Sequence, residues 1–220
     1  MIRSARRART PLVVAAVTLA LVLSGCATPR QDPAGASGTP TVSAAPTPPP
    51  TPSAAGSPAA DLVPVAAPTR LTFPAAGIDG PVDEYTAADA EAAGGVNPDS
   101  LDEIAWYSGI SDPMPGTDAK NTVYLFGHSW IEPAVFNGLK DVVVGDQATV
   151  TTANGELVYE VDDVFTLAKP DFTQDPRVVA MVPGRLALVT CHRPEGWDPS
   201  EHAPDNTVVF LHLVSATPAA

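Results

Sequence analysis

The stretch Leu186-Ala-Leu-Val-Thr-Cys-His-Arg193 carries the strongest structural signal in the sequence. Five residues of β-forming character lead up to Cys191, and the charged segment rich in Pro and Gly that follows must end the strand. Cys191 is therefore expected at or near the open end of a buried strand, where a scaffold presents side chains to a binding surface. A lone thiol in that place is either buried filler or a reactive group.

The other cysteine, Cys26, follows a segment typical of an export signal. Residues 1–25 combine four arginines and no acidic residue with an apolar run, 11–23. That run is short for a permanent membrane helix, which needs roughly 20 apolar residues. The segment ends in Leu23-Ser-Gly-Cys26, which resembles the lipobox of bacterial lipoproteins. The resemblance implies cleavage before Cys26 and lipidation of its thiol; the alternative is an ordinary secretory signal in which Cys26 is incidental.

Composition divides the rest of the chain. Residues 26–67 are rich in Pro, Ala, Thr, Ser and Gly, and predict a disordered, partly extended stalk that follows the lipidated cysteine. One folded domain is expected over 68–214, with a short tail at 215–220. Removal of the signal's four arginines takes the formal net charge from −13 to −17. This charge argues against nucleic acid and an anionic membrane surface as partners, so membrane contact is expected through the lipid anchor only.

The folded part reads as strands with little helix. Single strands are expected at residues 70–73, 121–127, 164–168, 185–190 and 207–213. A hairpin is expected from residues 147–152 and 157–161 around an Asn154-Gly155 turn. A turn at 77–80, a short helix over 88–93 and a helical or looped crossover at 132–139 complete the pattern. Many short strands with frequent Gly, Pro and Asp turns favour an all-β barrel or sandwich.

A nearby histidine is the usual group that activates a thiol, and the chain has four. His128 ends one strong strand pattern as Cys191 ends another, so both can meet at one rim of a barrel. His192 directly follows Cys191 and is expected on the opposite face of the strand. His202 has the simpler interpretation of a solvated loop residue, and His212 that of a strand residue. No close ligand spacing indicates a metal, and no cofactor is expected.

Several segments resemble motifs of the sortase family. Asn121-Thr-Val-Tyr-Leu-Phe-Gly-His128 is similar to the sortase histidine motif, and residues 186–191 are similar to its cysteine motif, Leu-x-Leu-x-Thr-Cys. Residues 136–139, Gly145-Asp146 and the Asn154-Gly155 hairpin follow the family's order, and residues 68–81 resemble the first strand of actinobacterial classes E and F. The resemblance, over about residues 68–214, implies a closed eight-stranded β-barrel with short helices in loops.

The resemblance also implies a cysteine transpeptidase. Lipidation of Cys26 would hold it at the extracellular face of the cytoplasmic membrane, and the stalk would project it into the cell wall. Such an enzyme cleaves a Leu-Pro-x-Thr-Gly-like sorting signal of a secreted protein after Thr and holds the acyl group as a thioester. It then passes that group to an amine of peptidoglycan or a pilin. Cys191 is then the nucleophile and His128 the acid and base, while Thr190 would orient the substrate.

One departure from the family concerns an arginine. Sortases carry it at the start of the last strand, opposite the cysteine, but residues 200–209 contain none. Class F spacing places Pro204 there, and other classes place Asn206. Arg193 is the nearest charged candidate, and Asn206 is able to donate a neutral hydrogen bond instead.

Two alternatives stay open. A sortase fold without its arginine could serve as a wall-binding or protein-binding module. A cysteine L,D-transpeptidase would also combine a lipoprotein signal with a Pro-rich stalk. Its motif, however, places His and Gly shortly before the cysteine, where this chain has Leu-Val-Thr.

Overall fold

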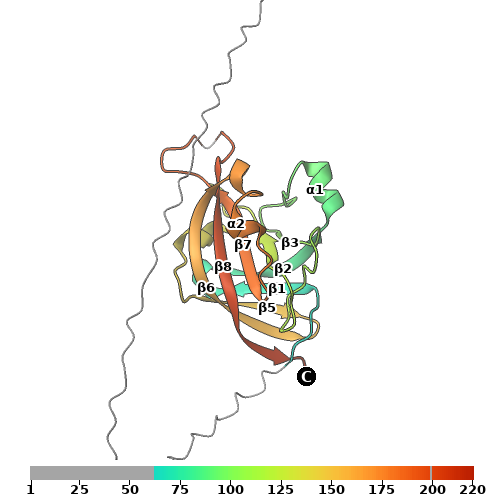
Figure 1. Cartoon of the computed structure of the whole chain (residues 1–220). Coiled ribbons are helices and arrows are strands. Elements are labelled where there is room, and N and C mark those ends of the chain that lie inside the picture. Colours follow the sequence, from blue (N-terminus) through green and yellow to red (C-terminus); the bar gives the residue numbers. More distant parts are fainter. Residues whose placement is uncertain (1–61, 199) are drawn as a thin grey trace, which may run out of the picture. The chain divides into compact units, whose positions relative to one another are not determined.

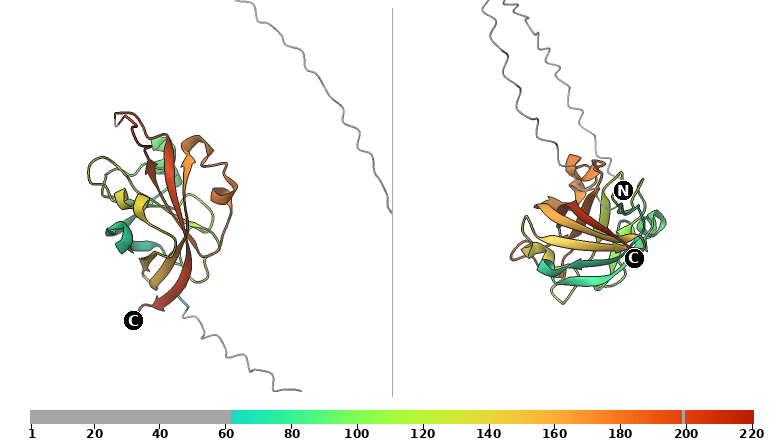
Figure 2. Two further views of the ribbon diagram at one scale, coloured as in Figure 1. Left: turned by 90° about the vertical axis from the view of Figure 1, so that its left-hand side faces the viewer. Right: turned by 90° about the horizontal axis from the view of Figure 1, so that it is seen from below.

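Eight strands close into a barrel in the order β1-β2-β3-β4-β7-β8-β6-β5 (Figures 1 and 2). The computed structural model describes residues 62–198 and 200–220. The predicted all-β, eight-stranded barrel is therefore confirmed. The expected export signal, Cys26 and nearly all of the expected stalk lie outside the described residues.

The strands are β1 (Pro68–Phe73), β2 (Ile78–Tyr85), β3 (Ile104–Tyr107), β4 (Val123–Phe126), β5 (Gln147–Thr152), β6 (Gly155–Ala168), β7 (Arg185–His192) and β8 (Asp205–Pro218). Two short helices, α1 (Ala87–Ala93) and α2 (Pro176–Val179), lie in the connections, with 3₁₀ turns at Pro74–Ala76, Asn137–Asp141 and Lys169–Asp171. None of the described helices is long and apolar enough to cross a membrane.

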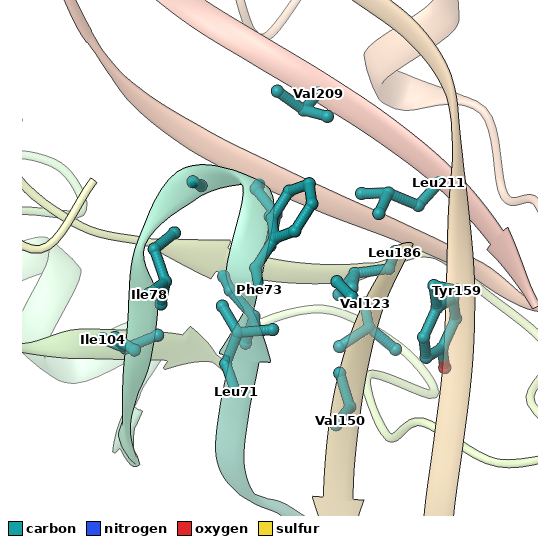
Figure 3. Close-up of a cluster of buried hydrophobic side chains, with 14 of the residues drawn as sticks. Leu71, Phe73, Ile78, Ile104, Val123, Val150, Tyr159, Leu186, Val209 and Leu211 are labelled. Carbon is teal, nitrogen blue, oxygen red and sulfur yellow. The ribbon is translucent and has the colours of Figure 1, made fainter. Parts of the chain in front are cut away.

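Strand β7 explains the apolar run that dominates the sequence, because it is buried on both faces. Leu186 and Leu188 point into the barrel, where they join an inner cluster that includes Phe73 and Leu211 (Figure 3). Alternate residues of a strand point to opposite faces, so Ala187 and Val189 belong to a second cluster outside the barrel. A strand covered on both faces reads as a continuous apolar run rather than an alternating one.

The second cluster forms what we call the outer apolar face. Its buried members are Tyr124, Val178, Ala187, Val189, Val208 and Phe210, and its half-buried members are Tyr107, Ile110, Phe126, Phe165, Leu167 and Phe172. The connection between β6 and β7 lies over this face, because it contributes Phe172 and the α2 residue Val178.

Arg185 bonds to the C-terminal part of the connection between β6 and β7. Its Nε donates to Thr122 Oγ1 at 2.8 Å, and its Nη2 donates to the Ala180 carbonyl at 2.9 Å. The Tyr124 hydroxyl donates to the carbonyl of Val178. The connection is therefore held over the outer apolar face by polar contacts as well as by packing.

The predicted turn at residues 77–80 is wrong, because Ile78–Gly80 already belong to β2. The turn is the 3₁₀ segment Pro74–Ala76, which Gly77 ends with a φ of 67°. Pro at the start and Gly past the end is the usual order of residues in such a turn.

The predicted hairpin exists, but its loop is residues 153 and 154 rather than Asn154-Gly155, since Thr152 pairs with Gly155. Gly155 opens β6 with a φ of 146°, and a Cβ atom there would lie 2.2 Å from the Thr217 carbonyl oxygen. The glycine is thus required by the neighbouring strand β8 as well as by the turn.

The strands expected at 157–161 and 164–168 are one continuous strand, β6, of 14 residues. Its register against β8 shifts between Val161 and Asp163, which indicates a β-bulge. The shift breaks the apolar alternation, and this break explains why the sequence pattern reads as two strands.

The ordered region extends beyond both expected domain bounds. Val63 is fully buried, and its N–H donates to Thr117 Oγ1 at 3.1 Å, so the residues just before 68 pack on the barrel. Strand β8 continues to Pro218, so most of the expected tail is strand. Its last residues pair with the start of β6, as Gly155 with Pro218 shows.

Candidate active site

Four neighbouring strands present their ends at one rim of the barrel. Strands β4, β7, β8 and β6 are adjacent; β4 and β7 are parallel, and β8 is antiparallel to both β7 and β6. Strands β4, β7 and β6 therefore end at the rim where β8 begins. In Figure 1 this rim is the upper end, away from the C-terminus.

Strand alternation places four polar residues on the outer side of this rim. Cys191 follows Ala187 and Val189 at two-residue steps, and Asn206 lies directly opposite it on β8. His128 and Lys169 each lie two residues beyond an outward residue, Phe126 on β4 and Leu167 on β6. The outer apolar face thus leads up to His128, Cys191, Asn206 and Lys169.

The pairing of β4 with β7 brings the expected histidine beside the expected nucleophile. Phe126 pairs with Val189, and the N–H of Gly127 donates to the Val189 carbonyl at 3.2 Å. His128 lies two residues after Phe126, and Cys191 lies two residues after Val189. The parallel register therefore leads both residues to the same rim of the barrel.

The hydrogen bond of His128 identifies which ring nitrogen is free. Its Nε2 lies 2.8 Å from the carbonyl oxygen of Pro98. A carbonyl accepts only, so Nε2 must carry a proton in this contact. Nδ1 is then the nitrogen that is able to take up or release a proton during a reaction.

Cys191 is half-buried and free of a disulfide, and a lysine side chain contacts it. The Nζ of Lys169 lies 3.4 Å from the Cys191 sulfur. No sequence motif marks Lys169. It lies 22 positions before Cys191, and only the register of β6 on β8 and β7 brings the two together.

Thr190 points away from the thiol, into the barrel. It is buried, and its hydroxyl donates to the Gly127 carbonyl at 2.8 Å. The contact ties the residue before Cys191 to the residue before His128, so it holds the two strand ends together. A role of Thr190 in substrate binding stays a prediction.

Arg193 reaches the segment that follows His128. Its Nη1 donates to the Ser129 carbonyl at 3.0 Å, and its guanidinium carbon lies 4.0 Å from the centroid of the Trp130 ring. Within the described part of the chain, Arg193 Nε is buried without a hydrogen-bond partner. These contacts brace the His128 segment; contact of Arg193 with a reacting group stays a prediction.

The other histidines have local partners or lie in solvent. His192 Nδ1 lies 3.3 Å from Thr207 Oγ1, on the inner side, as strand alternation predicts. His212 Nδ1 lies 2.8 Å from Asp162 Oδ1 on the surface, and His202 is exposed in the loop before β8.

A hollow of about 730 Å³ lies between the start of β2 and residues 131–138, and its lining includes none of the four rim residues. Among residues 62–198 and 200–220, no cluster of three His, Cys, Asp or Glu side chains is arranged to hold a metal ion.

Comparison with known proteins agrees with this fold. The Sortase domain matches residues 71–214, well over half of the chain, and the chain therefore belongs to the sortase family. A search of curated protein sequences found no match.

Solved sortases share the fold at low sequence identity. The SrtA sortase from Actinomyces oris superposes with a TM-score of 0.53 and 17% identity, over 72% of this chain and 89% of that one. Sortase E1 from Streptomyces coelicolor gives a TM-score of 0.50 and 17% identity over 70% and 91%. Listeria monocytogenes sortase A gives 0.50 and 19% identity over 70% and 92%.

Proposed function

We propose that the protein is a cysteine transpeptidase that cleaves a Leu-Pro-x-Thr-Gly-like sorting signal and transfers the acyl group to an amine. The observation that carries the proposal is the register of β4 and β7, which brings His128 and Cys191 to one rim. Both residues lie at the end of an apolar surface, and the proposed chemistry requires both a nucleophile and a proton carrier.

The outer apolar face is the proposed binding surface for the signal. Several of its members are only half-buried, among them Phe126, Leu167 and Phe172, so apolar area is available for a ligand. An extended peptide that lies along this face would bring its scissile bond to Cys191. Sortase E1 from Streptomyces coelicolor has been solved with a tripeptide in its active site.

In the first half-reaction, the Cys191 thiolate attacks the carbonyl carbon of the signal's Thr. A carbon–sulfur bond forms, and the carbonyl oxygen becomes negative. When the intermediate collapses, the peptide C–N bond breaks, and the leaving amine takes a proton from protonated His128. The thioester retains the acyl group.

In the second half-reaction, an amine attacks the thioester carbon. His128, now neutral, takes the proton that the amine loses, and the carbon–sulfur bond breaks to restore the thiolate. The new amide joins the secreted protein to its acceptor, for which we propose an amine of peptidoglycan or a pilin.

Three groups are proposed to stabilise the negative oxygen: backbone N–H groups beside Cys191, the Asn206 amide and the Arg193 guanidinium. Asn206 lies directly across from Cys191, in support of a direct role. Arg193 lies two residues after Cys191 and contacts Ser129 and Trp130, in support of a role through the His128 segment.

The proposed location is the extracellular face of the cytoplasmic membrane. A lipid on Cys26 would hold the chain there, and the Pro-rich residues after it would carry the barrel into the cell wall. The partners would be secreted proteins with a C-terminal sorting signal.

The test is mass spectrometry of the full-length protein after incubation with a sorting-signal peptide. We expect an acyl adduct on Cys191 in the wild type, release of the peptide's amine fragment, and neither product from Cys191→Ala. An adduct on any other residue would sink the nucleophile assignment. Peptide binding without an adduct in the wild type would favour the binding-module alternative.

A further inference from the structure

We propose that Lys169 supplies a positive charge that stabilises the thiolate form of Cys191, and that Lys169 thereby serves in place of an arginine on β8. The inference rests on the proposed function for its place in catalysis. The geometry that carries it, an ammonium nitrogen 3.4 Å from the sulfur, is independent of any substrate.

The backbone fixes the position of Lys169 relative to the thiol. Leu167 pairs with Asn206, and Asn206 pairs with Cys191, so the three residues form one row across β6, β8 and β7. Lys169 follows two residues later, on the same outer side, and its N–H donates to the Pro204 carbonyl at 3.1 Å. The side chain therefore reaches back from the rim over β8 to the sulfur.

Lys169 has no competing carboxylate among the ion pairs of the described residues. Arg177 is paired with Asp175 and lies over the Phe165 ring. Arg185 is bound to Thr122 and Ala180 at the opposite end of β7. Arg193 contacts the His128 segment. These three arginines are thus engaged elsewhere, whereas the Nζ of Lys169 lies 3.4 Å from the Cys191 sulfur.

The other titratable groups near the thiol belong to the same rim. His128 lies at this rim on the β4 side, and Asp171 is exposed in the turn that begins with Lys169. On β8, Asp205 lies opposite His192, and strand alternation turns its side chain to the other face from Cys191. Among the groups named here, Lys169 is thus the one on this face that carries a lasting positive charge, opposite in sign to the thiolate.

The positive charge of Lys169 would stabilise two negative charges in the proposed reaction, one on the sulfur and one on the carbonyl oxygen. A thiolate is the reactive form of cysteine, and a cation beside it increases the fraction present at neutral pH. The oxygen that becomes negative during attack is attached to the carbon bonded to this sulfur, so the same ammonium lies near that charge as well. Lys169 would stay positively charged throughout the reaction, while His128 would donate a proton in the first half-reaction and accept one in the second.

The effect can be measured without a substrate. The full chain with Cys26→Ser contains Cys191 as its sole thiol, because the sequence has two cysteines. The rate of alkylation by iodoacetamide is followed from pH 5 to pH 10 in this background and with Lys169→Met, Lys169→Arg and Lys140→Met added. Lys140 is the matched control, since it is an exposed lysine on the 3₁₀ turn Asn137–Asp141.

At pH 7 we expect alkylation of Lys169→Met to be about fivefold slower, as suits one cation in a solvated site. At pH 10 the rates should converge, because the thiol is then ionised in every variant. Lys169→Arg should restore most of the rate, Lys140→Met should leave it unchanged, and matching melting temperatures would confirm folding. Equal pH profiles for Lys169→Met and the wild type would overturn the proposal.

Two further outcomes separate this inference from the proposed function. An acyl adduct on Cys191, together with alkylation that does not depend on Lys169, would overturn the charge role and leave the transpeptidase standing. Alkylation that depends on Lys169 in a protein that forms no adduct with the peptide would support the charge role and sink the transpeptidase instead.

Discussion

At the residue scale, His128 is distinguished from the other histidines by its partner and its position. Its Nε2 is held by the Pro98 carbonyl, so the ring presents Nδ1 from the end of β4. We expect His128→Ala to lower the rate of amine release from a sorting peptide by about 10²–10⁴-fold, the usual contribution of acid–base catalysis. The matched control is His212→Ala, whose contact with Asp162 lies on the surface and whose loss should leave the rate unchanged. A larger loss in His192→Ala would contradict the assignment.

Arg193 and Asn206 can be separated by substitution. Loss of an oxyanion donor typically costs about 2.7–4 kcal/mol of transition-state stabilisation, so Arg193→Ala should lower turnover about 10²–10³-fold if the guanidinium acts on the oxygen. Asn206→Arg should then restore part of it, since residue 206 lies across from Cys191. Trp130→Leu removes the ring that Arg193 stacks on. An equal loss in Trp130→Leu would show that Arg193 acts by bracing the His128 segment.

The sequence identified the residues of the site that belong to continuous motifs. Cys191 and His128 each end an apolar run, and such a run is visible without knowledge of the pairing. Lys169 has no such signal, because its relation to the thiol depends on how β6 aligns with β8. Register across strands is set by turns and bulges far from the residues that it brings together.

At the element scale, strands with clear limits were predictable and strands shaped by tertiary contacts were not. The run before Cys191 identified β7, but β3 has only four residues and derives its stability from parallel pairing with β2 and antiparallel pairing with β4. The bulge in β6 interrupts the apolar alternation, so the sequence pattern predicts two strands where the structure has one. These features depend on neighbours distant in sequence, which local patterns do not contain.

The β5–β6 hairpin offers a test of the turn. Gly155→Ala requires a positive φ from alanine and brings its Cβ into the Thr217 carbonyl. We expect it to lower the free energy of unfolding by about 2–4 kcal/mol, measured by urea denaturation, since strain of about 1–2 kcal/mol adds to a backbone clash. Gly145→Ala is the matched control, because its φ is 95° and no atom lies within 4 Å of the new Cβ. Gly145→Ala should lose only the free energy that the backbone strain costs. Equal losses of unfolding free energy in the two variants would show that the clash with the Thr217 carbonyl contributes nothing.

At the scale of the whole molecule, the barrel has two apolar clusters, one that fills its interior and one on its outer side that we propose as the binding surface. The inner cluster fills the closed barrel, while the outer apolar face is only partly covered by the β6–β7 connection and ends at the rim that carries Cys191. A formal net charge of −13 for the chain disfavours electrostatic binding to an anionic membrane surface. The membrane contact that we propose is therefore the lipid on Cys26.

The two cysteines are expected to have separable roles, so a substitution at either one is the control for a substitution at the other. We expect Cys26→Ala to lose incorporation of a fatty-acid probe during growth and to be released from the membrane fraction, because the lipobox has lost its acceptor thiol. A lipid chain adds about 0.8 kcal/mol of membrane affinity for each buried CH₂, so its loss should be decisive for partitioning. Cys191→Ala should keep the label and the membrane fraction while it loses the acyl adduct with a sorting peptide. Label retained on Cys26→Ala would mean that the anchor lies elsewhere in the chain.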